Sequence, residues 1–330
     1  MRAMVLHRPA PIETKPLKLE NVEIGRVSDD ELLIKVVACG VCRTDLHIVE
    51  GDLRPLRKSV IPGHEIVGRV VEAGKNAVFK KGDIVGVPWL HSTCQKCEYC
   101  LSGRENLCER KTFTGYTENG GYAEYVVAKA PFTFKLWRRN PFEIAPLLCA
   151  GIIGYRAFKL ARPLQHGTIA MFGFGSSAHV TMQLAQKLGY SVAVVSRTPS
   201  HIELAKRLGA DYAYTYDQLK RAGKKFDGAI VFAPSGSIAL SALSSVKKGA
   251  TVAIADIYAT NIPEMPYEYI FGERKLMGVE ANTRQDAVEY LGLAHKFGIK
   301  PKVTVLPLEE ANEALLMVKK GAPGSVVLKI

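Results

Sequence analysis

The fold is decided by TIAMFGFGSSAHVTMQLAQKLGYSVAVVS, which runs from residue 168 to residue 196. TIAMFG (168–173) is a continuous apolar run, which predicts a strand buried on both faces. HVTMQLAQKLG predicts a helix, and SVAVVS (191–196) predicts a second buried strand. A helix between two such strands is typical of a parallel sheet.

The same alternation of strands and helices continues after residue 196. HIELAKRLGA and SIALSALSSV predict further helices, and DGAIVFAP (227–234), GATVAIAD (249–256) and KLMGVEA (275–281) predict further apolar strands. Strands that alternate with helices and are buried on both faces indicate a doubly wound parallel sheet of α/β class. Residues 151–282 are therefore predicted to form a nucleotide-binding domain of the Rossmann type.

The first 150 residues have a different pattern, in which short strands are separated by Gly and Pro. The expected strands are 31–40, 65–74, 83–90 and 120–128. This arrangement favours a barrel-like β domain. The tail, 285–330, alternates helix, strand, helix and strand, and periodicity alone does not place it.

Length and charge limit the classes of function. A chain of 330 residues exceeds what one core usually spans, so two domains are expected. The formal charge of +12 comes from Lys and Arg scattered along the chain in clusters no larger than pairs, which does not predict nucleic-acid binding. No run approaches the roughly 20 apolar residues of a membrane helix, and the N-terminus has no secretory pattern. We expect a cytoplasmic protein without membrane contact.

Four of the seven cysteines form one compact motif, Cys94-x2-Cys97-x2-Cys100-x7-Cys108. Four thiolates suit the tetrahedral coordination of a structural Zn²⁺, and short loops between ligands reduce the cost of ordering them. An iron–sulfur cluster is the alternative, because compact cysteine runs also hold those. We expect a closed zinc site without an open position for chemistry.

A second metal site is suggested by Cys42, in GVCRTDLH directly after an expected strand, and by His64, in PGHE. A third ligand is needed, and Cys149 in APLLCAGIIGY is a candidate, although nothing local separates it from an ordinary buried cysteine. Two thiolates and one imidazole leave the fourth position open, as in catalytic zinc sites.

These motifs carry a resemblance. GVCRTDLH, PGHEIVGRVVEAG, the four-cysteine motif and the GFGSSA turn occur in the order and spacing of the zinc-dependent medium-chain alcohol dehydrogenases, along nearly the whole chain. The resemblance implies a GroES-like catalytic domain over residues 1–150, completed by 283–330. It also implies that Trp89 and Leu90 line the substrate pocket, although they could equally belong to the core.

The resemblance further implies roles for residues around the open site. Cys42, His64 and Cys149 would hold the catalytic zinc. Glu65 matches an acid near the metal, and Asp45 matches the carboxylate that orients the ligand histidine.

Three more residues of the same segment match the substrate and coenzyme machinery of that family. Thr44 matches the hydroxyl that hydrogen-bonds the substrate oxygen, and His47 matches the outer end of a proton relay. Arg43 matches a residue that reaches the pyrophosphate of the coenzyme.

The glycine turn predicts where the coenzyme binds. Gly173, Gly175, Ser176, Ser177 and Ala178 follow a strand and open a helix, the context in which such a turn binds a pyrophosphate.

The end of the second strand bears on which coenzyme binds. It carries Ser196, Arg197 and Thr198 in place of the acid that usually holds the ribose of NAD. An arginine and two hydroxyls suit a 2′-phosphate, which favours NADP(H) over NAD(H), with use of both as the alternative.

The sequence therefore predicts a zinc alcohol dehydrogenase with two Zn²⁺ per chain. Its substrate would be a small alcohol, aldehyde or ketone, and we expect a homo-oligomer, dimer or tetramer, as in the family. The alternatives are a quinone or enoyl reductase of the same architecture, which would lack Cys42, His64 and the four-cysteine motif, and a non-catalytic redox sensor, which would not need Thr44 and His47.

Overall fold

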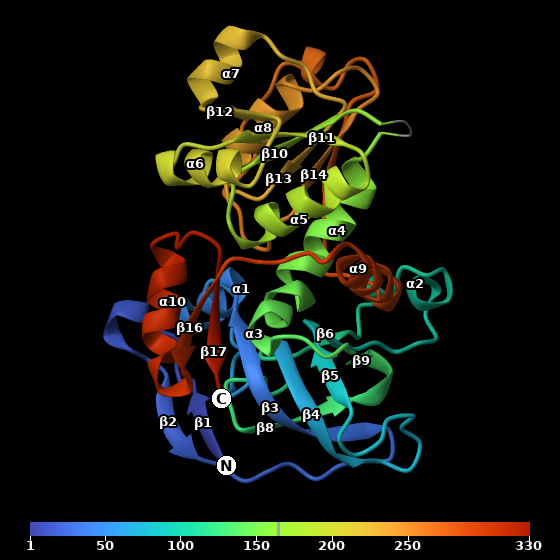
Figure 1. Cartoon of the computed structure of the whole chain (residues 1–330), viewed down its shortest axis with the longest axis vertical. Helices are drawn as coiled ribbons and strands as arrows, with labels where there is room; N and C mark the ends of the chain where they lie inside the picture. Colours follow the sequence, from blue (N-terminus) through green and yellow to red (C-terminus); the bar gives the residue numbers. More distant parts are fainter. Residues whose placement is uncertain (164–165) are drawn as a thin grey trace. The chain divides into compact units, whose positions relative to one another are not determined.

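The computed structural model describes residues 1–163 and 166–330, which form two compact units. Unit 1 comprises Met1–Cys149, Ala281–Gly292 and Pro301–Ile330, and unit 2 comprises Ala150–Glu280 and Leu293–Lys300. The predicted division assigned the whole of 283–330 to the first domain, whereas residues 293–300 pack with unit 2. Figure 1 labels the elements of both units.

Unit 2 is built on a six-stranded parallel sheet in the order β12-β11-β10-β13-β14-β15. Its strands are β10 (Thr168–Phe172), β11 (Ser191–Val195), β12 (Tyr212–Tyr214), β13 (Gly228–Val231), β14 (Thr251–Ile254) and β15 (Lys275–Gly278). From β10 the chain adds β11 and β12 on one side of the sheet. It then crosses to the other side of β10 and adds β13, β14 and β15, so the strand order reverses between β10 and β13. This is the doubly wound arrangement in which coenzymes bind at the carboxyl ends of the strands.

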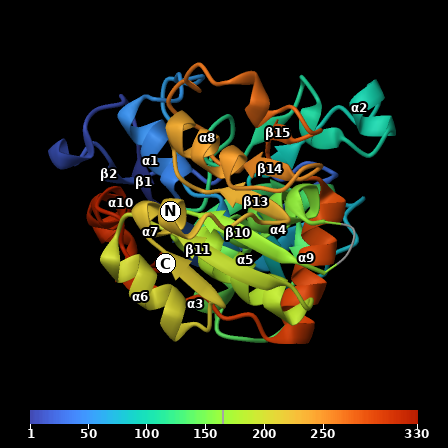
Figure 2. The same cartoon turned by 90° about the horizontal axis from the view of Figure 1, so that it is seen from above.

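The helices of unit 2 cover both faces of this sheet (Figure 2). They are α4 (Ala150–Ala161), α5 (Ser176–Lys187), α6 (Pro199–Arg207), α7 (Tyr216–Ala222) and α8 (Gly236–Ser244), with a short 3-10 helix, η5 (Tyr267–Tyr269). Leu219 of α7 and Ala242 of α8 share one buried cluster with Phe172, so these two helices cover the same face. The strand β12 and the helix α7 were not expected from the sequence.

Unit 1 contains a seven-stranded sheet in the order β16-β17-β3-β4-β5-β9, with β8 paired to β3. Its strands are β3 (Glu31–Val41), β4 (Glu65–Ala73), β5 (Ile84–Val87), β8 (Tyr125–Lys129), β9 (Phe134–Lys135), β16 (Val303–Pro307) and β17 (Ser325–Lys329). Two small antiparallel pairs complete the β structure, β1 (Arg2–Val5) with β2 (Lys18–Asn21) and β6 (Leu90–Ser92) with β7 (Thr112–Phe113).

Short helices join these strands. They are α1 (Arg43–Glu50), α2 (Glu98–Leu101), α3 (Pro141–Ile144) and α10 (Ala311–Lys319), with the 3-10 helices η1 (Ile12–Thr14), η2 (Glu105–Leu107), η3 (Ala130–Phe132), η4 (Ala145–Leu148) and η6 (Leu308–Glu310); α9 (Arg284–Phe297) has residues in both units. The last strand, β17, pairs antiparallel with β3, so the tail completes the sheet of unit 1.

The expected fold class is confirmed, because the chain combines a mixed β domain with a doubly wound parallel sheet. Two strands differ from expectation. The strand expected over 83–90 is two strands, β5 and β6, separated by Pro88, which has no N–H to donate. The strand expected over 120–128 begins only at Tyr125, because the backbone N–H groups of residues 120–122 bond to residues 61–63 instead.

No single helix within the described residues is long and apolar enough to cross a membrane. One bent pair, Pro141–Leu148 with Ala150–Ala161, reaches that limit by length and composition alone.

Candidate metal and coenzyme sites

The junction between β3 and α1 presents the first thiol. Cys42 is the N-cap of α1, and its Sγ accepts a hydrogen bond from the Thr44 backbone N–H at 3.5 Å. The Asp45 carboxylate closes the capping box by accepting the Cys42 N–H at 2.9 Å. Because a capping box fixes the first turn of a helix, this local sequence holds the Cys42 side chain at the strand end.

The buried Asp45 carboxylate also holds His64, which lies in the turn before β4. His64 Nδ1 is 2.9 Å from Asp45 Oδ1, and both side chains are fully buried. Burial lowers the pKa of His64, but the charge and hydrogen bond of Asp45 outweigh it and raise that pKa well above its usual value. Within the described residues His64 Nε2 has no nitrogen or oxygen partner, and its neighbour is the Cys42 thiol. The histidine is therefore oriented with one nitrogen directed to the thiols.

Four potential metal ligands converge at this point. One ligand atom each from Cys42, His64, Glu65 and Cys149 lies within 4.8 Å of all the others, and the two sulfurs are 4.0 Å apart. Glu65 faces Gly40 across the β3–β4 pair, and a Cβ at Gly40 would lie 1.7 Å from Glu65 Oε2. Glycine at position 40 is thus required for the carboxylate to reach the cluster.

The two thiols of this cluster are electrostatically coupled. A hydrogen bond from Cys149 is the largest influence on Cys42 and lowers the pKa of Cys42 well below its usual value. The same hydrogen bond and burial raise the pKa of Cys149 well above its usual value. The thiolate of Cys42 is therefore stabilised by the proton of the Cys149 thiol, and a bound cation would replace that proton.

Thr44, His47 and Arg43 extend along the first turns of α1. Thr44 Oγ1 is 3.6 Å from Cys42 Sγ, so the hydroxyl borders the metal ligands. His47 lies three residues further on, on the same helix face, and its Nδ1 is 2.7 Å from Asp52 Oδ2. The guanidinium of Arg43 donates to the Val318 carbonyl of α10 at 3.0 Å, within unit 1.

An aromatic stack stands beside His64. The ring of Trp89 lies 4.9 Å from the His64 ring, edge to face, and is stacked on Phe113 at 4.6 Å and Tyr116 at 6.1 Å. The Tyr116 hydroxyl donates to the Arg54 carbonyl at 2.7 Å. Of these three aromatic residues the sequence suggested only Trp89, which it named together with Leu90; Phe113 and Tyr116 were missed because their contacts are made only in the folded chain.

The four-cysteine motif forms a second cluster in unit 1. Ligand atoms of Cys94, Cys97, Cys100 and Cys108 all lie within 4.8 Å of one another. Hydrogen bonds, the largest from the Lys96 backbone, lower the pKa of Cys94 to about 5. A backbone hydrogen bond from Cys100 lowers the pKa of Cys97, but burial and the neighbouring sulfurs outweigh it and raise that pKa to about 11. The thiols share protons among themselves, which suits replacement of those protons by a metal.

The segment carrying these cysteines is anchored to α9. Arg284 Nη2 is 2.7 Å from Glu105 Oε2, and the Arg284 backbone N–H donates to Glu105 Oε1 at 2.7 Å. The Arg284 guanidinium also stacks over the Phe132 ring at 4.7 Å. Glu105 thereby fastens the cysteine segment to the tail inside unit 1.

The glycine turn in unit 2 has the expected form. Gly173 has a φ of +91°, Gly175 is the N-cap of α5, and no side chain among the described residues caps that helix. At the end of β11, Ser196 is buried, and its Oγ accepts the Thr198 N–H at 3.2 Å. Arg197 and Thr198 are exposed. The structure thus places a helix N-terminus and a basic strand end in the same unit.

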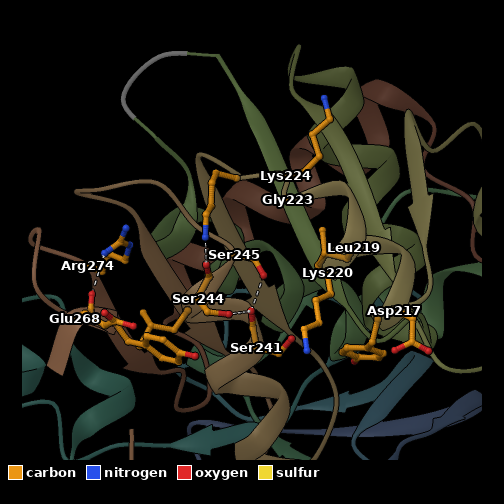
Figure 3. A pocket seen from close by; sticks show the side chains of 14 residues that line it. Asp217, Leu219, Lys220, Gly223, Lys224, Ser241, Ser244, Ser245, Glu268 and Arg274 are labelled. Atoms are coloured by element: carbon orange, nitrogen blue, oxygen red, sulfur yellow. Dashed lines mark hydrogen bonds between the residues drawn. The ribbon is translucent and has the colours of Figure 1, made fainter. Parts of the chain in front are cut away.

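A cavity of about 620 Å³ in unit 2 contains none of these residues (Figure 3). It is lined by α7, by the end of α8 and by the segment around η5. Lys220, Lys224 and Arg274 make its lining basic, and the Arg274 guanidinium donates to the backbone carbonyls of Glu268 and Phe271. The cavity does not coincide with any residue predicted to bind the coenzyme.

One contact at the metal ligands was missed from the sequence. The buried Tyr122 hydroxyl donates to Asp45 Oδ2 at 3.3 Å, across 77 positions of the chain. A signal for this residue is the pair of glycines before it, which marks a close approach of the backbone, but nothing local identifies its partner.

The chain matches two family models, "Alcohol dehydrogenase GroES-like domain" over residues 28–138 and "Zinc-binding dehydrogenase" over residues 178–296. It is 41% identical to a probable alcohol dehydrogenase of Mycobacterium tuberculosis, covering 100% of this chain and 97% of that protein. It is 37% identical to an alcohol dehydrogenase of Geobacillus stearothermophilus, covering 96% of each. A cobalt- and zinc-bound thermostable alcohol dehydrogenase of Pyrobaculum aerophilum has a TM-score of 0.91 at 27% identity, covering 100% of this chain and 99% of that one.

The chain belongs to the zinc-dependent medium-chain alcohol dehydrogenase family. It is an oxidoreductase that acts on the CH–OH group of alcohols and uses zinc and a nicotinamide coenzyme.

Proposed function

We propose that the protein interconverts an alcohol and the corresponding aldehyde or ketone at a zinc site formed by Cys42, His64 and Cys149, with NADP(H) as its preferred coenzyme. The observation that carries this proposal is the convergence of two thiols, an oriented imidazole and a carboxylate within 4.8 Å of one another. A second, structural zinc would be held by Cys94, Cys97, Cys100 and Cys108.

The donor set fits a catalytic zinc ion. Two thiols and one imidazole leave a position open, and Glu65 is a further donor that can approach the ion. Asp45 fixes the His64 tautomer in which Nδ1 carries the proton and Nε2 is the ligand. When bound there, zinc supplies Lewis acidity to the substrate oxygen.

Residues of α1 would manage the proton that leaves the alcohol. The Thr44 hydroxyl borders the ligands, so it can accept a hydrogen bond from the substrate oxygen and pass a proton on. His47, on the same helix face, would receive that proton. Both side chains belong to one rigid helix, which keeps the path in place.

The coenzyme preference rests on the end of β11. When bound, the coenzyme carries the hydride chemistry, and the protein supplies its binding and orientation. Ser196, Arg197 and Thr198 offer a positive charge and two hydroxyls where an acid would select NAD(H). The pyrophosphate would lie at the N-terminus of α5, over Gly173 and Gly175.

A homo-oligomer is supported by the edge of the sheet in unit 2. β15 is the last strand of that sheet, and the segment before it carries exposed Tyr258, Tyr267 and Phe271, the last two 71% and 65% exposed. Exposed aromatic side chains next to an edge strand favour association with a second copy.

The test is a screen of primary, secondary and cyclic alcohols with NADP⁺ and NAD⁺ in parallel. The rate of each reaction is measured by the increase in absorbance of the reduced coenzyme. We expect turnover with at least one class of alcohol and a higher kcat/KM for NADP⁺ than for NAD⁺. Absence of turnover with every alcohol–coenzyme pair would contradict the proposed activity. A higher kcat/KM for NAD⁺ would contradict the preference alone.

A further inference from the structure

Tyr122 is a buried residue of unit 1 whose hydroxyl is linked to the metal ligands through Asp45. Its side chain has no exposed surface, and its hydroxyl donates to Asp45 Oδ2 at 3.3 Å. Burial and the charge of Asp45 raise the pKa of Tyr122 well above its usual value. The hydroxyl therefore keeps its proton and remains a hydrogen-bond donor.

The backbone holds Tyr122 against the turn that carries His64. The Tyr122 N–H donates to the Pro62 carbonyl at 3.0 Å, and the Gly121 N–H donates to the Gly63 carbonyl at 2.9 Å. Gly63 has a φ of +98°, and a Cβ there would lie 2.4 Å from Tyr122 Cδ1. A glycine is needed at position 63 so that the tyrosine ring can pack directly on the turn.

The Asp45 carboxylate divides its hydrogen bonds between its two oxygens. Oδ1 accepts from the His64 ring at 2.9 Å and from the Gly63 N–H at 3.2 Å. Oδ2 accepts from the Cys42 N–H at 2.9 Å and from the Tyr122 hydroxyl. Three of these donors come from the two segments that carry Cys42 and His64, whereas Tyr122 comes from a third segment. Without its hydroxyl, the buried carboxylate would lose a donor that compensates for its removal from water.

We propose that Tyr122 is a positioning residue that slows the release of the catalytic zinc, because it holds Asp45 in the orientation that directs His64 Nε2 to the thiols. This inference rests on the proposed function, in which Cys42, His64 and Cys149 hold that zinc. Groups that hydrogen-bond to metal ligands orient them, and their loss typically weakens metal affinity or activity by about 10- to 100-fold. Tyr122 is one contact further from the metal than Asp45, so we expect an effect at the lower end of this range.

The test follows the release of zinc from the holoenzyme to a chelating dye that absorbs visible light when it binds zinc. Two zinc sites should give two phases, and the phase that is absent from Cys42→Ser belongs to the catalytic site. We expect Tyr122→Phe to speed that phase about 10-fold and to leave the phase of the four-cysteine cluster unchanged. The unchanged phase is an internal control, because a general destabilisation of unit 1 would speed both phases.

Cobalt in place of the catalytic zinc gives a second measurement, because the visible absorption of Co²⁺ depends on the geometry of its ligands. We expect the absorption bands to shift in Tyr122→Phe, whereas a merely structural role would lower the Tm and leave the bands in place. The phenylalanine keeps the ring that packs on Gly63, so the fold should survive. Tyr125→Phe removes a hydroxyl at the start of β8, in the same part of the chain, and should change neither zinc release nor the cobalt bands.

A double substitution tests whether Tyr122 acts through Asp45. In an Asp45→Asn background, Tyr122→Phe should have no further effect on zinc release. Zinc release at the wild-type rate in Tyr122→Phe, unchanged cobalt bands, faster release from both sites, or a full additional effect in the Asp45→Asn background would each overturn the inference. If the wild type releases a single zinc per chain, the metal site of the proposed function fails, and the inference fails with it.

Discussion

At the scale of single residues, Asp45 organises the metal ligands. Its two oxygens accept hydrogen bonds from the Cys42 N–H, the Gly63 N–H, the His64 ring and the Tyr122 hydroxyl. A buried carboxylate that accepts four hydrogen bonds is satisfied without water and orients each of its donors. The same oxygens that cap α1 therefore also set the tautomer of a metal ligand.

The coenzyme preference is decided by single residues at the end of β11. Replacing the exposed Arg197 by Asp would remove a contact to the 2′-phosphate and add repulsion. We expect kcat/KM for NADP⁺ to fall by about 10- to 150-fold, the equivalent of a hydrogen bond to a charged group of about 1.5–3 kcal/mol, with little change for NAD⁺. Arg207→Asp, an equal charge change on the exposed side of α6, is the control. Equal losses for both coenzymes would refute the assigned contact.

Sequence reasoning identified residues better than it identified contacts. Cys42, Asp45, His64 and Glu65 stand in two short motifs, and the structure brings them together with Cys149. The contact of Asp45 with Tyr122 and that of His47 with Asp52 could not be predicted in the same way. Tyr122 approaches Asp45 from a distant segment, and Asp52 reaches His47 only because Gly51 turns the chain.

At the scale of elements, long and buried strands were predictable and short or exposed ones were not. β10 and β11 have continuous apolar sequences, so their positions follow from the hydrophobic pattern. β12 has three residues, and Tyr212 is 42% exposed, so it carries no such pattern. The helix α7 had a usable signal, the capping box of Thr215 and Gln218, which hydrophobic periodicity alone overlooks.

The segment that carries the four-cysteine cluster, residues 93–111, should need its bound metal to stay folded. In Cys97→Ser we expect the loss of one zinc per chain, protease cleavage within residues 93–111, and a fall in Tm of roughly 5–10 °C, as for a loss of about 3 kcal/mol. Ser102→Ala, an exposed substitution in the same segment, should leave the zinc content, the protease resistance and the Tm unchanged. Iron in place of zinc in the wild-type protein would show that the alternative, an iron–sulfur cluster, is correct.

At the scale of the whole molecule, the candidate metal ligands and the candidate coenzyme-binding residues at the glycine turn and the β11 end belong to different units. Unit 1 contains every predicted metal ligand, and unit 2 contains the glycine turn and the basic strand end. The tail returns to unit 1 because β17 pairs with β3, the strand that leads to Cys42. Periodicity could not predict this pairing, since it joins residues almost 300 positions apart. The family resemblance predicted only that the tail completes the first domain, without naming the strand that it joins.

The central claim is that Cys42 belongs to a catalytic zinc site, and it is tested most directly by zinc content per chain in Cys42→Ser compared with Cys39→Ala. The hydroxyl introduced by Cys42→Ser can still cap α1, so the helix should survive. Cys39 is buried in β3 and lies outside both cysteine clusters.

We predict two zinc ions per chain in the wild type and in Cys39→Ala, and one in Cys42→Ser, with alcohol oxidation lost in Cys42→Ser alone. Two zinc ions and wild-type turnover in Cys42→Ser would contradict the account.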